Sequence, residues 1–199
     1  MDSTSSERYL PEGSRSVKVV VLGPFGVGKT TFVRAVSEIR PLHTEERMTQ
    51  AGELVDDLSG LAGKDTTTVA MDFGRVTLAD DVVLYVFGAP GQARFARMVR
   101  SLLEGALGGI VLVDTRRLRA SFDAIDLLEE AGLPYTVAVN GFDGTSDTYS
   151  DAELRDALTI ADDRPLVRLD ARFRHSAKQG LVVLVTDILH PRTRTESSR

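Results

Sequence analysis

The fold is decided by Gly23-Pro24-Phe25-Gly26-Val27-Gly28-Lys29-Thr30, a stretch that matches the pattern GxxxxGK followed by Ser or Thr. A valine-rich run over residues 17–22 precedes it and predicts a buried strand. Apolar residues at helical spacing over residues 30–39 follow it. In such a strand–loop–helix unit, backbone N–H groups of the loop surround an anion, and the helix N-terminus adds partial positive charge. The stretch therefore predicts a site for nucleotide phosphates.

Two side chains at the end of this loop have separate predicted roles. Lys29 is expected to reach the β- and γ-phosphates, and the Thr30 hydroxyl is expected to take one position around Mg²⁺. The alternative is a chance glycine-rich turn, and the clean strand before the loop and the clean helix after it argue against that alternative.

Strand and helix patterns alternate along the rest of the chain. Strands are predicted over 69–78 and 82–87, which form a hairpin, and over 109–113, 135–139 and 166–169. Helices are predicted over 118–130, 151–158 and 176–189. This order predicts an α/β three-layer sandwich, with a six-stranded, mostly parallel sheet, one antiparallel edge strand and about five helices. Ligands of such sheets bind beyond the carboxyl ends of the strands.

The composition is that of a soluble globular protein. The 199 residues are 42% apolar and 27% charged, with a net charge of −5, so neither disorder nor a nucleic-acid surface is expected. The absence of cysteine excludes a disulfide framework, a thiolate zinc site and a thiol nucleophile. No apolar run approaches a membrane span, and Asp2 stands where a myristoylation signal needs glycine. We expect a cytoplasmic protein without a direct membrane anchor, with flexible tails over 1–16 and 191–199 around one domain, 17–190.

Four further segments lie beside predicted strands. They are TVAMDF at 68–73, FGAPGQARF at 87–95, VNGFD at 139–143 and LDAR at 169–172. With the phosphate loop they resemble the Ras-like small GTPases over residues 17–190. The matching family motifs are the switch-one threonine, WDTAGQxRF, NKxD and SAK. The resemblance implies a switch I at about 43–68, with a helical piece near 45–58, and a switch II at about 88–100.

The resemblance implies GTP as the ligand and gives each motif a role. A carboxylate at Asp143 could accept from guanine N1 and N2, a pairing that adenine cannot reproduce. Asn140 is implied to tie the base loop to the phosphate loop, and the Ala171 N–H to donate to guanine O6. The implied GTP-binding residues are Gly23, Phe25, Gly26, Val27, Gly28, Lys29, Thr30, Thr31, Gly91, Asn140, Asp143, Ala171 and Arg172. Taken alone, the segment from Asn140 to Gly144 is also an ordinary turn sequence.

The family's catalytic roles fall on Lys29, Thr68 and Gln92. Thr68 is implied to bind both Mg²⁺, together with Thr30, and the γ-phosphate. The Gly91 N–H is implied to contact the same phosphate, and Gln92 to orient the attacking water. Gln92 could instead be no more than a helix-start residue.

Three positions depart from the family pattern. Gly88 stands where the family has the aspartate linked to magnesium, Gly141 replaces the lysine of NKxD, and Asp170 replaces the serine of SAK. We therefore expect weak magnesium binding and slow hydrolysis. Asp72, on the strand antiparallel to the one that carries Phe87, is the nearest carboxylate that could substitute, although its side chain could simply face solvent or a partner.

Within the superfamily, the segments TTTVAMDFG and GAPGQARF look like those of actinobacterial conservon GTPases and, more distantly, gliding-motility polarity GTPases. This likeness implies a signalling switch with a roadblock-type partner and, in conservons, a sensor-kinase-like protein at the membrane. Two other functions stay open: a nucleotide-binding scaffold with negligible turnover, and a P-loop ATPase or kinase, in which Asn140 and Asp143 would have no role.

Overall fold

A computed structural model describes residues 13–40, 42–49, 66–142 and 148–190. The strands are β1 (Arg15–Leu22), β2 (Leu42–Thr49), β3 (Thr66–Ala79), β4 (Val82–Gly88), β5 (Gly108–Val113), β6 (Tyr135–Asn140) and β7 (Leu166–Leu169). The α-helices are α1 (Lys29–Val36), α2 (Ala96–Leu103), α3 (Phe122–Glu130), α4 (Asp151–Leu158) and α5 (Arg174–Leu189). Two 3-10 helices, η2 (Ala93–Phe95) and η3 (Thr115–Ser121), precede α2 and α3.

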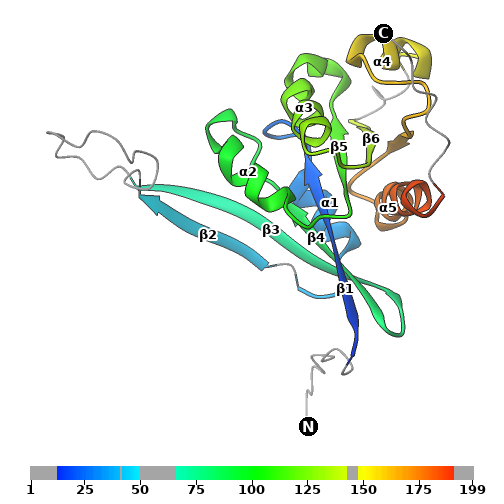
Figure 1. The fold of residues 1–199 in the computed structure, drawn as a ribbon. Coiled ribbons are helices and arrows are strands. Elements are labelled where there is room, and N and C mark those ends of the chain that lie inside the picture. The colour runs from blue at the N-terminus through cyan, green and yellow to red at the C-terminus, as the bar shows by residue number, and fades with distance from the viewer. Residues whose placement is uncertain (1–12, 41, 50–65, 143–147, 191–199) are drawn as a thin grey trace, which may run out of the picture.

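Within these residues the strands form a single sheet in the order β2-β3-β4-β1-β5-β6-β7. β4, β1, β5, β6 and β7 are parallel, whereas β3 is antiparallel to both of its neighbours. In Figure 1, β2 and β3 form a long ribbon that reaches away from the helices. The predicted α/β class and P-loop architecture are confirmed.

Helices cover both faces of the sheet. Successive side chains of β1 point to opposite faces, and apolar side chains on both faces need cover. Val19 and Val21 pack with Phe32 of α1 and Leu181 of α5 on one face. Val20 and Leu22 pack on the other face with α2, α3 and residues at the end of α4. Each such fully buried side chain stabilises the fold by roughly 2 kcal/mol. The two layers of helices hold the carboxyl ends of the strands in fixed positions.

The structure differs from the sequence-based expectation at three elements. Residues 45–49 lie in β2, so the start of the helical piece expected near 45–58 is wrong, while 50–58 lie outside the described residues. β2 adds a seventh strand and takes the edge position expected for β3. The helix expected over 118–130 is divided between η3 and α3.

The first helix is also shorter than expected, ending at Val36 and not at residue 39. Ser37 has extended backbone angles, and its hydroxyl donates to the Ile39 carbonyl and accepts the Arg75 N–H. Because serine side chains form such local bonds readily, they compete with continuation of a helix.

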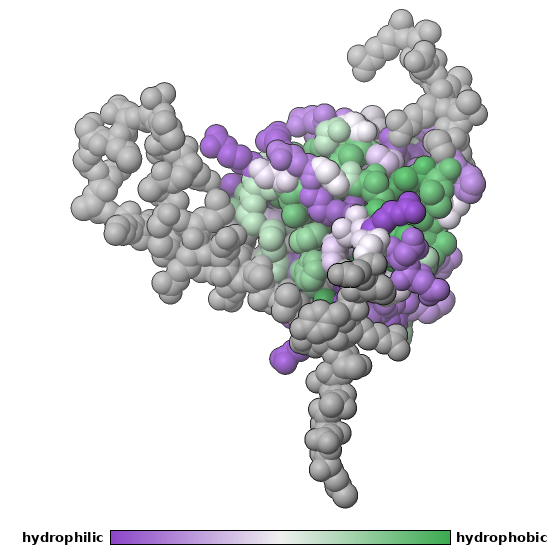
Figure 2. Space-filling view, turned by 60° about the horizontal axis from the view of Figure 1, so that its bottom comes forward, coloured by the Kyte–Doolittle hydropathy of each residue, from purple (hydrophilic) through white to green (hydrophobic). Residues whose placement is uncertain are grey.

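None of the helices in the described part of the chain combines the length and apolarity needed to cross a bilayer. The visible face in Figure 2 carries polar and apolar side chains beside one another. Most of the predicted site residues follow the carboxyl ends of β1, β4, β6 and β7, at one edge of the sheet. Residues 1–12 and 191–199 of the predicted tails lie outside the described residues, whereas Arg15 and Ser16, expected in the N-terminal tail, begin β1.

Candidate functional site

The phosphate loop lies between β1 and α1, as the sequence predicts. Gly28 has a left-handed φ of 106°, and a Cβ there would lie 2.8 Å from the Asn140 amide nitrogen. Only glycine satisfies both conditions. Val27 is buried, whereas Phe25 is 71% exposed and Thr31 is exposed. The loop is therefore anchored at Val27 and open toward solvent at its tip.

Lys29 points back into the loop that it closes. Its Nζ donates to the carbonyls of Gly23 at 2.7 Å and Pro24 at 2.8 Å. Burial lowers the pKa of Lys29 to about 8, and the carboxylate of Asp72 partly opposes that shift. An ammonium held in this way is a cation available for an incoming phosphate.

Asp72 places a carboxylate beside position 88. The two residues are paired across β3 and β4, and a Cβ on Gly88 would lie 3.3 Å from the Asp72 carboxylate. Asp72 is only 6% exposed, and its Oδ2 accepts the Thr30 hydroxyl at 2.5 Å. The carboxylate therefore faces the phosphate loop, and the expectation that it could face solvent is wrong.

The donor set around Thr30 suits a hard divalent cation. A hydroxyl and a carboxylate are oxygen ligands of the kind that Mg²⁺ prefers, and Mg²⁺ usually keeps several waters and takes phosphate oxygens as well. Among the residues described, no three His, Asp or Glu side chains gather at one point. A magnesium ion here would depend on the nucleotide for part of its coordination.

The segment after β4 lies directly against the phosphate loop. A Cβ on Gly91 would stand 2.4 Å from Lys29 Nζ and 2.7 Å from the Phe25 nitrogen, so only glycine fits. Gln92 follows it and is exposed. Together with Thr30 and Asp72 these residues line a cleft of about 420 Å³, a volume typical of small-ligand sites. The structure thus brings Gly91 and Gln92 to the phosphate loop.

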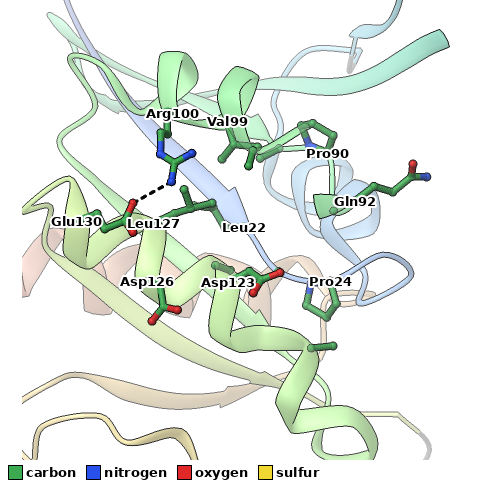
Figure 3. Close-up of a pocket in the computed structure, with 16 residues that line it drawn as sticks. Leu22, Pro24, Pro90, Gln92, Val99, Arg100, Asp123, Asp126, Leu127 and Glu130 are labelled. Atoms are coloured by element: carbon green, nitrogen blue, oxygen red, sulfur yellow. Dashed lines mark hydrogen bonds and ion pairs between the residues drawn. The ribbon is translucent and has the colours of Figure 1, made fainter. Parts of the chain in front are cut away.

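The same segment also borders a second cleft, of about 230 Å³, between α2 and α3 (Figure 3). Pro90 and Gln92 lie at one end of it, with Val99 and Leu127 on its walls. At the other end Arg100 donates to Glu130 at 3.0 Å. Because residues 89–92 line both clefts, a displacement of this segment changes both.

Asn140 links the base side of the site to the phosphate side. Its Nδ2 donates to the Val27 carbonyl at 2.9 Å, and its Oδ1 accepts the Ala171 N–H at 2.9 Å. All three residues are buried. The tie to the phosphate loop implied by resemblance is present, whereas the Ala171 N–H, implied as a donor to the base, is engaged by Asn140 in this structure.

Two other predicted residues are placed less directly. Arg172 is exposed and donates to the Asp170 carboxylate at 2.7 Å. Thr68 lies within β3, four residues before Asp72 and so about 13 Å from it along the strand. Asp143 lies outside the described residues. The roles of Thr68 and Asp143 therefore stay predictions.

Sequence reasoning missed the buried Asp114, which directly follows β5. Its carboxylate accepts Arg116 at 2.8 Å and Arg117 at 3.3 Å. These hydrogen bonds lower the pKa of Asp114, although burial opposes them. The available signal was a charged residue ending a run of nine apolar or glycine positions, at the sheet edge where ligands bind.

Comparisons with known proteins support a P-loop nucleotide-binding fold. A family described as "Conserved hypothetical ATP binding protein" matches residues 21–193. An elongation factor G-like protein of Synechocystis is 23% identical over 172 residues, which are 85% of this chain and 25% of that protein. This chain thus spans about a quarter of that relative's length. The FeoB G-domain from Methanococcus jannaschii has a similar fold, with a TM-score of 0.58 at 17% identity over 88% of this chain and 99% of the G-domain.

Proposed function

This chain belongs to the family of conserved hypothetical ATP-binding proteins, and from that premise we propose that it is a GTP-binding molecular switch with slow intrinsic hydrolysis. The family and the G-domain-like fold establish a P-loop nucleotide-binding protein. The choice of GTP, the hydrolysis and the switching are our proposal.

The observation that carries the proposal is the pair of hydrogen bonds made by Asn140. One side chain at the end of β6 holds both the phosphate loop, through Val27, and the loop after β7, through Ala171. Binding of phosphate alone would not require a connection between these two loops. A ligand that extends from the phosphate loop to the ends of β6 and β7 would require it, because both ends of the ligand then rest on one rigid unit. Asp143, three residues further, supplies the guanine-reading carboxylate in this proposal.

Magnesium fits the phosphate side of the site. Thr30 and Asp72 would hold the ion, directly or through water, and a bound Mg²⁺ would neutralise charge on the phosphates. Lys29 binds the phosphates in the same proposal, and Gln92, exposed beside Gly91, orients the attacking water. Slow turnover is part of the proposal because Gly88 stands where the small GTPases have the aspartate linked to magnesium.

The switching partner is proposed from the sequence resemblance. The segments that look like conservon GTPases support a roadblock-type regulatory protein as the partner, with a sensor-kinase-like membrane complex as a second one. Residues 88–100 are the proposed contact, because residues 89–92 lie against the phosphate loop and line both clefts. A change in the nucleotide phosphates would therefore reach the partner's surface through this segment.

ATP is the second candidate ligand, and the family's own description favours it. A nucleotide-binding scaffold without turnover is the third function, favoured by the glycine at position 88. Adenine offers N1 as an acceptor and N6 as a donor, so a carboxylate such as Asp143 cannot pair with it as with guanine.

Competition between nucleotides tests the proposal. Release of a fluorescent GDP analogue is followed with unlabelled GTP, ATP or XTP as competitor, and hydrolysis is then timed with and without a purified roadblock-type protein. We expect GTP to compete at least about tenfold better than ATP. Equal or better competition by ATP would overturn the GTP assignment, and no phosphate release in either condition would leave only the scaffold.

A further inference from the structure

A cluster around Asp114 lies between the two halves of the candidate site. Asp114 directly follows β5, and β5 pairs with β1 on one side and β6 on the other. Its side chain is fully buried and accepts the Arg116 backbone N–H at 3.0 Å, so it caps the η3 turn. It also accepts the side chains of Arg116 and Arg117, which are each 52% exposed. One buried carboxylate thus fixes two guanidinium groups at the edge of the sheet.

Arg117 extends from this cluster to the phosphate loop. Its backbone is non-helical (φ −147°, ψ 49°) within η3, and its Nη2 donates to the Phe25 carbonyl at 3.4 Å. The same nitrogen would lie 3.8 Å from a Cβ on Gly26. Arg117 therefore contacts the exposed tip of the phosphate loop, the part that Val27 and Asn140 do not anchor.

Arg116 extends in the other direction, to the base loop. Its guanidinium lies 4.2 Å from the centre of the Phe142 ring, which is within the range of a cation–π contact. Phe142 follows Gly141, a residue with no side chain to make a contact of its own. Arg116 therefore contacts Phe142, the described residue that directly precedes the predicted base-reading residue Asp143.

We propose that Asp114, Arg116 and Arg117 form a two-arginine clamp that positions the phosphate loop and the base loop for the nucleotide. This proposal rests on the proposed function, since it assigns these residues to the same nucleotide site. The clamp acts by pre-ordering both loops, so that less ordering is left for the ligand to impose. The two half-exposed guanidinium groups also raise the local positive potential where a polyphosphate arrives.

The clamp predicts separate effects for its two arms. Arg117→Ala frees the tip of the phosphate loop and speeds release of a bound fluorescent GDP analogue about tenfold, the effect of losing one modest hydrogen bond to a charged group. Arg116→Ala and Phe142→Leu each remove the cation–π contact, and the double variant is no faster than either alone. Arg119→Ala, an exposed arginine of the same turn, is the matched control and leaves the rate unchanged.

Hydrogen exchange on the nucleotide-free protein separates positioning from a purely structural role. The Val27 amide, which donates to the Pro24 carbonyl at 3.3 Å, should exchange faster in Arg117→Ala than in the parent and in Arg119→Ala. If exchange changes only within residues 114–121, Asp114 and its arginines merely stabilise their own turn and the clamp is wrong. Equal release rates in Arg117→Ala and Arg119→Ala would overturn it as well.

The nucleotide-release measurement and the hydrogen-exchange measurement also distinguish failure of the clamp from failure of the proposed function. If the parent binds no guanine nucleotide, the proposed function fails, while the exchange measurement, which needs no ligand, still decides whether Arg117 orders the phosphate loop.

Discussion

The two ends of the candidate nucleotide site are built differently. At the phosphate end, the polar groups are close together and partly buried: Lys29 donates to the loop carbonyls, and Thr30 donates to Asp72 at 2.5 Å. At the base end, a single buried amide, Asn140, makes the connection, and Phe142 is supported from the side by Arg116. Among the described residues, the phosphate end is therefore held by contacts around one loop, whereas the base end is joined to it through Asn140.

Both ends nevertheless show the same kind of replacement. Gly88 lacks the expected carboxylate, and Asp72 supplies one from the neighbouring strand β3. Gly141 lacks the lysine side chain of the family motif, and Arg116, from the segment after the neighbouring strand β5, places its guanidinium over the adjacent Phe142 ring. Because paired residues of adjacent strands lie side by side, a side chain on one strand can reach the position of a side chain on the next.

The largest effect is expected at the phosphate end, from Lys29→Ala. Removing one partner of a desolvated charge pair costs about 2–5 kcal/mol. Nucleotide affinity should therefore fall by about thirtyfold to a few thousandfold. Lys178→Ala is the control, since Lys178 pairs with Glu38 at 3.6 Å on another part of the surface. Isothermal titration with GTP measures both, and unchanged affinity in Lys29→Ala would contradict the assignment of the phosphate loop.

Asp72→Ala should lower the apparent magnesium affinity of the nucleotide-bound protein about hundredfold. Removal of a carboxylate that orients a ligand of the metal typically costs ten- to a hundredfold in affinity, and Asp72 accepts the Thr30 hydroxyl. Asp80→Ala removes an exposed carboxylate from the turn of the same hairpin and serves as the control. Both variants are compared by the rate of nucleotide release over a magnesium titration, and equal curves would remove Asp72 from the site.

At the base end, Asn140→Ala should destabilise the nucleotide-free protein by about 2 kcal/mol, because the Ala171 N–H and the Val27 carbonyl lose their buried partner. Thr136→Val on the same strand is a matched control. The Thr136 hydroxyl is buried without a hydrogen-bond partner in the described part of the chain, so its loss should be neutral or slightly stabilising. Urea unfolding decides; equal destabilisation by both variants would mean that the Asn140 contacts contribute nothing specific.

The smallest expected effect is a pH dependence carried by Lys29. Its pKa in the nucleotide-free protein is about 8, and bound phosphate keeps the ammonium charged. Below pH 8 the lysine is already protonated, whereas above pH 8 binding must take up a proton, so affinity at pH 9 should be about tenfold weaker than at pH 7. Lys29→Arg keeps its charge and should give a flat profile. A flat profile in the parent would show that Lys29 is not buried as described.

The same pKa predicts the opposite trend for stability. The pKa of Lys29 is lowered from 10.5 in the unfolded chain to about 8 in the folded, nucleotide-free protein. Between these values the unfolded chain binds more protons, so this residue makes the fold more stable as pH rises from about 8 to 10.5. Denaturant unfolding at pH 8 and pH 10, in the parent and in Lys29→Arg, measures the difference between the two proteins.

Much of the fold could be predicted because it depends on local patterns. Val19–Leu22 and the glycine-rich loop specify a strand and a turn without reference to distant residues. β2 could not be predicted in the same way, because its charged sequence, LHTEERMT, has no clear period and its pairing with β3 is a long-range contact. The division between η3 and α3 depends on the side chain of Asp114, which the spacing of apolar residues does not reveal.

The site could be predicted where one motif contains all the interacting residues. It could not be predicted where the interacting residues come from two segments far apart in the sequence. Lys29 and Thr30 follow from one motif, whereas the contact of Asp72 with Thr30 joins residues 42 positions apart and depends on the pairing of β3 with β4. The resemblance to known GTPases located Asn140 correctly beside the phosphate loop. It did not indicate Arg117, since the family pattern has no residue in that role.

The central claim, that Asp72 supplies from β3 the carboxylate missing at position 88, is tested most directly by moving that carboxylate back. The experiment compares magnesium-dependent nucleotide release in the parent, in Asp72→Ala and in the double variant Asp72→Ala with Gly88→Asp. The double substitution also removes the carboxylate that a side chain at position 88 would meet at 3.3 Å. The account predicts that Asp72→Ala loses tight magnesium binding and that the double variant regains most of it. A parental magnesium response in Asp72→Ala, or a double variant as weak as the single one, would contradict it.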